Sequence, residues 1–131
     1  AVHLVAEGIE YFKAGRHTEA LESLSDALEM DPSNIEGLVA RGALCANSGN
    51  YEKAIKDFEA ALKLNQGHTN ARKYLGETLV AYGHSLESEK RFNEAKKMYM
   101  LCLSLISSHE EAKNALERLK QRINHEIEQN V

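Results

Sequence analysis

Apolar and small residues recur along this chain at one fixed interval. Gly8, Gly42 and Gly76 lie 34 residues apart, and Leu4 is matched by Leu38 at the same interval. Four further pairs follow this period: Ala20 with Ala54, Leu24 with Phe58, Ala27 with Ala61, and Leu28 with Leu62. Within each copy the apolar residues are spaced as on one face of a helix. A repeat of this length predicts stacked helix pairs.

Two regular copies of the pattern occupy residues 1–34 and 35–68. Each copy predicts two helices, because Gly15 and Gly49 each suit a turn between two apolar-periodic stretches. The expected helices cover residues 2–14, 18–30, 35–48 and 52–64.

The third copy, residues 69–109, is seven residues longer than the others. The alanine expected at residue 88 is replaced by Ser88, and Ala95 follows seven residues late. Seven residues make about two helical turns, so the insertion nearly preserves the face that the helix presents. The apolar rhythm continues across Gly83, through Leu75, Leu79, Tyr82 and Leu86. We therefore predict one helix over about residues 70–90, rather than a helix that ends at Gly83 and a long loop.

Two more helices are expected after this one. Residues 94–106 look apolar nearly all round, because Met100, Leu101 and Ile106 stand where the first copy has polar residues. We expect the last helix and the end of the preceding one to cover this face, and the alternative is a partner or self-association surface. Residues 110–131 are amphipathic and predict a terminal helix that caps the array.

Polar residues predict where three of the helices begin. Ser33 with Glu36, and Ser108 with Glu111, have the spacing of capping boxes. Thr69 is the expected N-cap of the long helix.

Composition narrows the class of protein. The length of 131 residues predicts a single domain, residues 1–131. Lys and Arg total 16 against 20 Asp and Glu, and the net charge of −4 lacks the basic excess of a dedicated nucleic-acid binder. No apolar stretch is long enough to span a bilayer, and no signal peptide is visible. We expect an intracellular protein and, because the first residue is Ala1 rather than methionine, a piece of a longer one.

The stretch RGALCANSG, Arg41 to Gly49, has the glycines and cysteine of an active-site loop, but it is one copy of the repeat. A phosphate-binding loop needs Lys-Ser or Lys-Thr after the second glycine, and neither follows. Cys45 stands at the core position that Tyr11 holds in the first copy, with no histidine or acid placed to activate it. The six histidines show no i, i+4 pair that would hold a metal. We predict a protein that is not an enzyme and needs no cofactor.

The period of 34, with G-x-x-Y, A-x-x-x-[LF]-x-x-A and a closing Asp-Pro, resembles the tetratricopeptide repeat. The matching residues are Gly8, Tyr11, Ala20, Leu24, Ala27 and Pro32 in the first copy, and Gly42, Ala54, Phe58 and Ala61 in the second. Leu4 and Leu38 stand in place of the usual tryptophan. The resemblance implies an all-α solenoid of three helix-turn-helix repeats, the third with an extended first helix, and a C-terminal capping helix. It also implies a protein or peptide as the partner.

Three segments are similar to one branch of that family: LVARGAL at 38–44, HTNARKYLGETLV at 68–80 and LESEKRFNEA at 86–95. In this branch the repeats follow an S1-type RNA-binding domain and precede a charged tail. The likeness implies a nuclear, RNA-associated adaptor that meets RNA through the full-length protein.

Stacked helix pairs form a concave surface lined by the first helix of each pair. We expect a peptide to bind there through apolar anchors on the first two pairs, and a segment preceding this chain is the alternative occupant. The predicted binding residues are Val5, Ile9, Phe12, Val39, Ala43, Asn47, Asn70, Lys73 and Glu77. Chaperone-binding members of the family hold a C-terminal carboxylate with a clamp of Lys, Asn and Arg side chains. The resemblance places the clamp positions at Val5, Ile9, Ala40, Asn70 and Tyr74. These residues do not form that clamp, so we do not expect a chaperone tail as the ligand.

Charged residues add two expectations. Arg41 stands where the repeat has leucine, and Glu7 holds that place one repeat earlier, so we expect a half-buried ion pair between them rather than ligand contact. Basic residues around the third repeat form a candidate patch for RNA or an acidic partner: Arg72, Lys73, Lys90, Arg91, Lys96 and Lys97. We favour a solvated face, because no aromatic stacking platform accompanies them.

The sequence thus predicts an interaction scaffold that binds a partner peptide, within a nuclear, RNA-associated protein. Two alternatives stay open: a direct RNA-binding accessory domain, and a homodimerisation module that uses residues 94–106. Strong salt dependence of RNA retention would support the first. A mass that rises with concentration would support the second.

Overall fold

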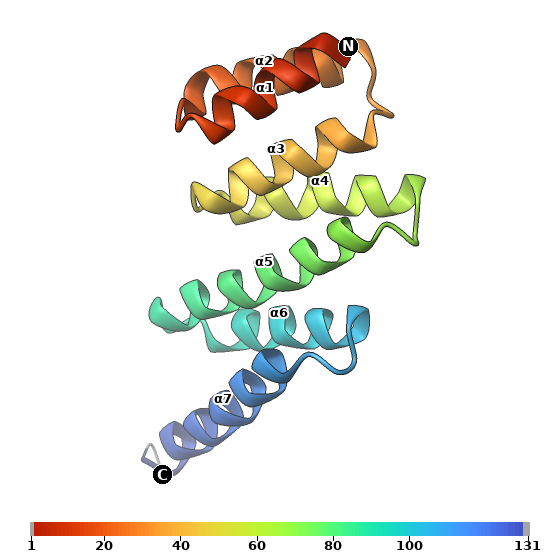
Figure 1. Ribbon diagram of the computed structural model, residues 1–131. Coiled ribbons are helices and arrows are strands. Elements are labelled where there is room, and N and C mark those ends of the chain that lie inside the picture. The colour runs from red at the N-terminus through yellow and green to blue at the C-terminus, as the bar shows by residue number, and fades with distance from the viewer. Residues whose placement is uncertain (1, 130–131) are drawn as a thin grey trace. The chain divides into compact units, whose positions relative to one another are not determined.

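The computed structural model describes residues 2–129, and every regular element in that range is an α-helix. Figure 1 shows the helices in chain order: α1 (Val2–Lys13), α2 (His17–Met30), α3 (Ile35–Asn47), α4 (Tyr51–Leu64), α5 (Thr69–Ser88), α6 (Phe92–Leu105) and α7 (Glu110–Gln129). Their bounds lie within about two residues of those expected, the usual precision of such predictions. The last two residues of the predicted capping helix lie outside the described range. The all-α prediction is confirmed.

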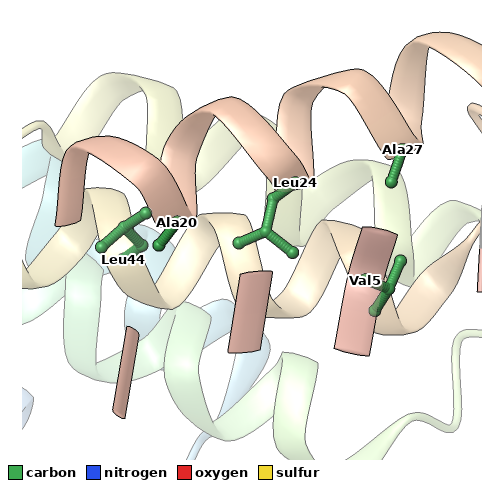
Figure 2. Close-up of a cluster of buried hydrophobic side chains, with 5 residues drawn as sticks. All are labelled: Val5, Ala20, Leu24, Ala27 and Leu44. Carbon is green, nitrogen blue, oxygen red and sulfur yellow. The ribbon is translucent and has the colours of Figure 1, made fainter. Parts of the chain in front are cut away.

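The chain divides into two compact units, Ala1–Leu75 and Gly76–Val131. In the first unit α1 packs on α2 and α3 packs on α4, and α3 also contacts both helices of the first pair. Figure 2 shows the centre of this packing, where side chains from three helices meet: Val5 of α1, Ala20, Leu24 and Ala27 of α2, and Leu44 of α3. The apolar faces that the repeat predicted are therefore the faces that form this core.

The recurring glycines lie where the two helices of a pair approach closely. A Cβ atom at Gly8 would come within 2.6 Å of Leu24 Cγ, and one at Gly42 within 2.7 Å of Phe58 Cε1. In both pairs the glycine and its large neighbour are 16 residues apart in the sequence. Leu24 and Phe58 are fully buried. Gly42, the first glycine of the RGALCANSG stretch, is thus a packing residue inside a helix and not part of a ligand loop.

Helix α5 runs without interruption through Gly83, which confirms the prediction of one long helix. A Cβ atom at Gly83 would overlap the ring of Tyr99, again 16 residues further on, so this pair repeats the contact of the first two. Gly76, which is in step with the 34-residue period, faces the end of the Ile106 side chain instead. The seven additional residues therefore lie before the crossing point, between Thr69 and Gly83.

A polar network surrounds Tyr99 in the second unit. The Tyr99 hydroxyl donates to Glu87 Oε1 at 2.7 Å and lies 3.0 Å from His84 Nδ1. His84 Nε2 lies 3.4 Å from Glu111 Oε1 of α7, and Arg122 Nη1 donates to Glu87 Oε2 at 3.3 Å. Burial and the hydrogen bond to Glu87 raise the pKa of Tyr99 far above its usual value, so the hydroxyl keeps its proton. The network connects α5, α6 and α7 and fixes the ring of Tyr99.

The prediction that neighbouring helices cover the apolar face of α6 is correct only in part. Ile106, just after α6, packs against Gly76 of α5. Met100 and Leu101 remain 50% and 44% exposed. α7 packs on α6 and buries Ala112, Ala115 and Leu119, but it leaves those two side chains in contact with solvent.

The caps of α3, α5 and α7 differ from those predicted. Helix α3 is capped by Asn34, whose Oδ1 accepts a hydrogen bond from Gly37 N at 3.0 Å. Histidines cap the other two helices. His68 Nδ1 accepts from Ala71 N at the start of α5, and His109 Nδ1 accepts from Ala112 N at the start of α7, both at 3.1 Å. The predicted caps Ser33, Thr69 and Ser108 are wrong, because each lies one residue from the residue that caps the helix. The capping boxes with Glu36 and Glu111 are wrong for the same reason.

The turn between the two helices of each pair contains one residue with positive φ. Gly15 and Gly49 supply it at φ 78° and 80°, and Lys90 holds the equivalent place in the third pair at φ 61°. A side chain in this left-handed region crowds the following carbonyl and costs about 1–2 kcal/mol. The third turn is therefore strained where the first two are not.

Lys90→Gly is expected to raise the free energy of unfolding by about 0.5–1 kcal/mol, because the relief of this strain exceeds the extra backbone entropy that glycine loses on folding. Urea denaturation followed by circular dichroism measures the change. Gly49→Ala is the matched control and should lower stability. A less stable Lys90→Gly variant would contradict the strain that we assign to this turn.

Candidate peptide-binding groove

A groove of about 460 Å³ lies in the first unit between α1, α3 and the beginning of α5. Its lining residues are Ile9, Phe12, Ile35, Glu36, Val39, Ala40, Ala43, His68, Asn70 and Tyr74. Most of these side chains are aliphatic or aromatic, and a few polar groups accompany them, which is the usual composition of a ligand site.

Five of the nine predicted binding residues line this groove: Ile9, Phe12, Val39, Ala43 and Asn70. The other four do not. Val5 is only 2% exposed and belongs to the core beneath the groove, so a ligand cannot reach it. Asn47 and Lys73 are exposed but lie outside the lining, and Glu77 belongs to the second unit.

Two aromatic residues of the lining pack against other rings. The Phe12 ring meets His17 edge-on, with 5.6 Å between ring centroids. The Tyr74 ring lies tilted against Phe58, at 6.1 Å. Phe58 is itself fully buried against Gly42, so the packing that brings α3 and α4 together also supports Tyr74. The sequence pattern did not mark Tyr74 as a lining residue, although the clamp position assigned by resemblance fell on it.

The polar lining residues lie at the first turns of two helices. Glu36 is in the first turn of α3, while His68 and Asn70 flank the start of α5. Because His68 Nδ1 accepts a hydrogen bond from Ala71 N, the neutral ring carries its proton on Nε2. This end of the groove thus offers one carboxylate, one ring N–H donor and one side-chain amide.

Arg41 forms a bidentate ion pair with Asp57 of α4, with Nε to Oδ2 at 2.8 Å and Nη2 to Oδ1 at 2.9 Å. Its Nη1 donates to Ser25 Oγ at 3.4 Å, and Lys53 Nζ lies 3.6 Å from Asp57 Oδ1. The hydrogen bond with Asp57 raises the pKa of Arg41, so the guanidinium is charged in a largely buried site. The predicted pair with Glu7 is wrong, and Glu7 is exposed. Arg41 therefore stabilises the first unit and is not available to a ligand.

Neither cysteine has the surroundings of a nucleophile. Cys45 is 4% exposed, and burial raises the pKa of its thiol. Cys102 is fully buried, with its pKa raised to about 11, and its thiol donates to Gly76 O at 3.4 Å. Both stay protonated at neutral pH and behave as small core residues. Within residues 2–129, no three His, Cys, Asp or Glu side chains are grouped so that they could hold a metal ion.

The six residues of the candidate basic patch do not come together in one unit. Two of them, Arg72 and Lys73, belong to the first unit and four to the second. Arg72 Nη2 donates to Gln66 O at 2.8 Å, and Arg91 pairs with Glu94. The other members are Lys90 in the strained turn, and Lys96 and Lys97 beside the exposed Met100 and Leu101. None of the helices within the described range is long and apolar enough to cross a membrane.

Models of the tetratricopeptide repeat match residues 5–69 and 76–109, which together make up most of the chain. Tetratricopeptide repeat protein 14 of Mus musculus is 44% identical over 98% of this chain. RNA polymerase II-associated protein 3 of Homo sapiens is 28% identical over 94% of it. The chain spans 17% of the length of each of these two relatives.

Solved structures with similar folds include the first tetratricopeptide domain of Spaghetti (RPAP3) bound to the HSP90 peptide SRMEEVD. It is 26% identical, with a TM-score of 0.61, over 94% of this chain and 92% of that one. The first such domain of human RPAP3 is 26% identical, with a TM-score of 0.59, over 95% and 92% of the two chains. MamA, 22% identical with a TM-score of 0.65 over 95% and 64%, shares the fold.

Proposed function

Because this chain belongs to the tetratricopeptide repeat family of all-α solenoids, we propose that it is a protein-interaction scaffold and that the groove of its first unit binds a peptide segment of a partner. The observation that carries this proposal is the groove itself. It is open, mainly apolar, and lined by the first helices of the first two pairs together with the start of α5. Neither the buried cysteines nor the buried ion pair offers catalytic chemistry in its place.

A relative supports a peptide as the ligand. The domain of Spaghetti (RPAP3) that is 26% identical to this chain was solved with a bound peptide. Isolated apolar side chains on a surface are ordinary, but a concave cluster of them marks an interaction site. The ligand would place apolar side chains against Ile9, Phe12 and Val39, which lie together in the lining.

We place this scaffold within a nuclear, RNA-associated protein. The support is the likeness to tetratricopeptide repeat protein 14 and to an RNA polymerase II-associated protein. The chain would act there as an adaptor, and the full-length protein would meet RNA.

The test is capture of partners from nuclear extract by the wild-type chain and by an Ile9→Glu/Val39→Glu variant, with and without nuclease. Two carboxylates in an apolar groove should reduce capture by at least about tenfold, because a bound ligand would bury them without partners. Leu64→Glu is the matched control, since Leu64 is 48% exposed and lies outside the groove. Circular dichroism verifies that all three proteins are equally helical.

The outcomes separate three functions. Nuclease-resistant partners that are lost only from the groove variant support the peptide site, and unchanged capture contradicts it. Partners whose capture is lost on nuclease treatment, but is unchanged in the groove variant, favour direct RNA binding. A mass that rises with concentration, and falls again in Met100→Glu, favours self-association through the exposed face of α6.

A further inference from the structure

We infer that the segment bound in this groove carries a lysine or arginine beside its apolar anchors, and that an acidic tail is excluded. The inference rests on the proposed function and specifies the chemistry of its partner. It follows from the one acidic side chain that lines the groove and from the lysines and arginines nearby that are absent from its lining.

The groove contains one acidic side chain and no lysine or arginine. The acidic side chain is Glu36, which is exposed. No ion pair within residues 2–129 involves Glu36. Its carboxylate is therefore available to a cation brought by the ligand.

Cations nearby in the sequence do not supply this partner. Arg41 is held by Asp57 in the core. Lys13, next to Phe12, extends into solvent and lies 3.8 Å from Glu10. Lys73 is exposed and lies outside the lining. Across residues 1–75, eight Lys and Arg face eleven Asp and Glu, so the field of the whole unit also favours a basic ligand.

The two neutral polar groups at the same end suit a peptide backbone. The Nε2–H of His68 and the Asn70 amide are donors that can bind carbonyl oxygens of an extended segment. A basic side chain next to such a carbonyl would reach toward Glu36, at the beginning of the neighbouring helix.

The contrast with the peptide-bound relative sharpens this inference. Its ligand, SRMEEVD, carries one arginine but three acidic residues, and the acidic residues all lie within its last four positions. Such a peptide would bring its carboxylates toward Glu36 with no lysine or arginine in the lining to offset the repulsion. Like charges placed together at an interface act against the wrong partner more strongly than opposite charges favour the right one.

A random twelve-residue peptide library displayed on phage tests this. The library is selected on the immobilised 131-residue chain, and peptides that still bind the uncharged groove variant Ile9→Asn/Val39→Asn are discarded, because this variant adds no carboxylate that would itself attract basic peptides. The same selection is run on Glu36→Lys and, as the matched charge change on an exposed residue outside the groove, on Glu59→Lys. We expect groove-dependent peptides rich in Lys and Arg from the wild type and Glu59→Lys, and peptides rich in Asp and Glu from Glu36→Lys.

The strongest wild-type peptide is then compared with its Lys→Glu analogue by fluorescence anisotropy. We expect the analogue to bind about tenfold more weakly, from the loss of one charge pair and the gain of one repulsion. Groove-dependent peptides with no basic preference, or with an acidic one, would overturn the inference and leave the proposed function standing. If every selected peptide also bound the groove variant, both the inference and the proposed peptide-binding function would be contradicted.

Discussion

Asp57→Ala is expected to lower the free energy of unfolding by about 3 kcal/mol, at the lower end of the range for breaking a buried pair. Without Asp57, Arg41 keeps only the 3.4 Å contact with Ser25 Oγ as a hydrogen-bond partner. The Arg41 side chain is 14% exposed, so water can replace little of what is lost. An unpaired charge in such a site costs more than the intact pair contributes.

A double-mutant cycle tests the pair. Arg41→Met alone should be milder than Asp57→Ala, because Lys53 Nζ still lies 3.6 Å from Asp57. Adding Arg41→Met to Asp57→Ala should restore part of the lost stability, since it removes the unpaired charge. Urea unfolding of the four proteins gives the coupling free energy. Strictly additive losses would show that the two groups do not depend on each other.

Gly83→Ala is expected to destabilise the chain by about 2 kcal/mol net, although alanine favours a helix by about 1 kcal/mol. The new Cβ would meet three atoms of the Tyr99 ring, with Cδ1 at 2.8 Å and Cζ at 2.9 Å. The ring cannot move aside easily, because it is fully buried and its hydroxyl is held by His84 and Glu87.

Gly76→Ala in the same helix is the matched control. Its Cβ would approach Ile106 Cδ1 at 2.8 Å, and the next nearest atom is 3.7 Å away. The end of a flexible side chain can rotate, so helix preference should dominate and leave stability equal or slightly higher. Thermal unfolding of the two variants compares them directly. Equal losses would mean that the Tyr99 contact is not the cause.

The 34-residue period predicted the helices well, because each helix pair needs the same apolar faces and the same glycines in order to pack. A second regularity in the same sequence was missed. The 16-residue offset that joins Gly8 to Leu24 and Gly42 to Phe58 also joins Arg41 to Asp57. The expected partner Glu7 came from comparing equivalent positions in successive repeats. The contact that formed is the one between the two helices of a single pair.

The groove was harder to predict than the fold. Periodicity assigns a residue to a face of its helix, but exposure depends on how the helices cross. Val5 lies on the same face of α1 as Ile9, yet it is buried because it packs against Gly37 of α3. A Cβ atom at Gly37 would lie 3.4 Å from Val5 Cγ2. His68 was missed because Ser and Thr are the residues expected to cap helices. It caps α5 through a ring nitrogen and lines the groove as well.

The two buried cysteines have a practical consequence, because one belongs to each unit. A thiol reagent can reach either sulfur only after the helices around it separate, so alkylation reports local opening rather than surface reactivity. The rate at which Cys45 is alkylated thus reports how often the first unit opens, and the rate for Cys102 reports the same for the second unit. Equal modification rates would mean that the whole array opens as one cooperative body, and unequal rates would rank the two units by the ease with which each comes apart.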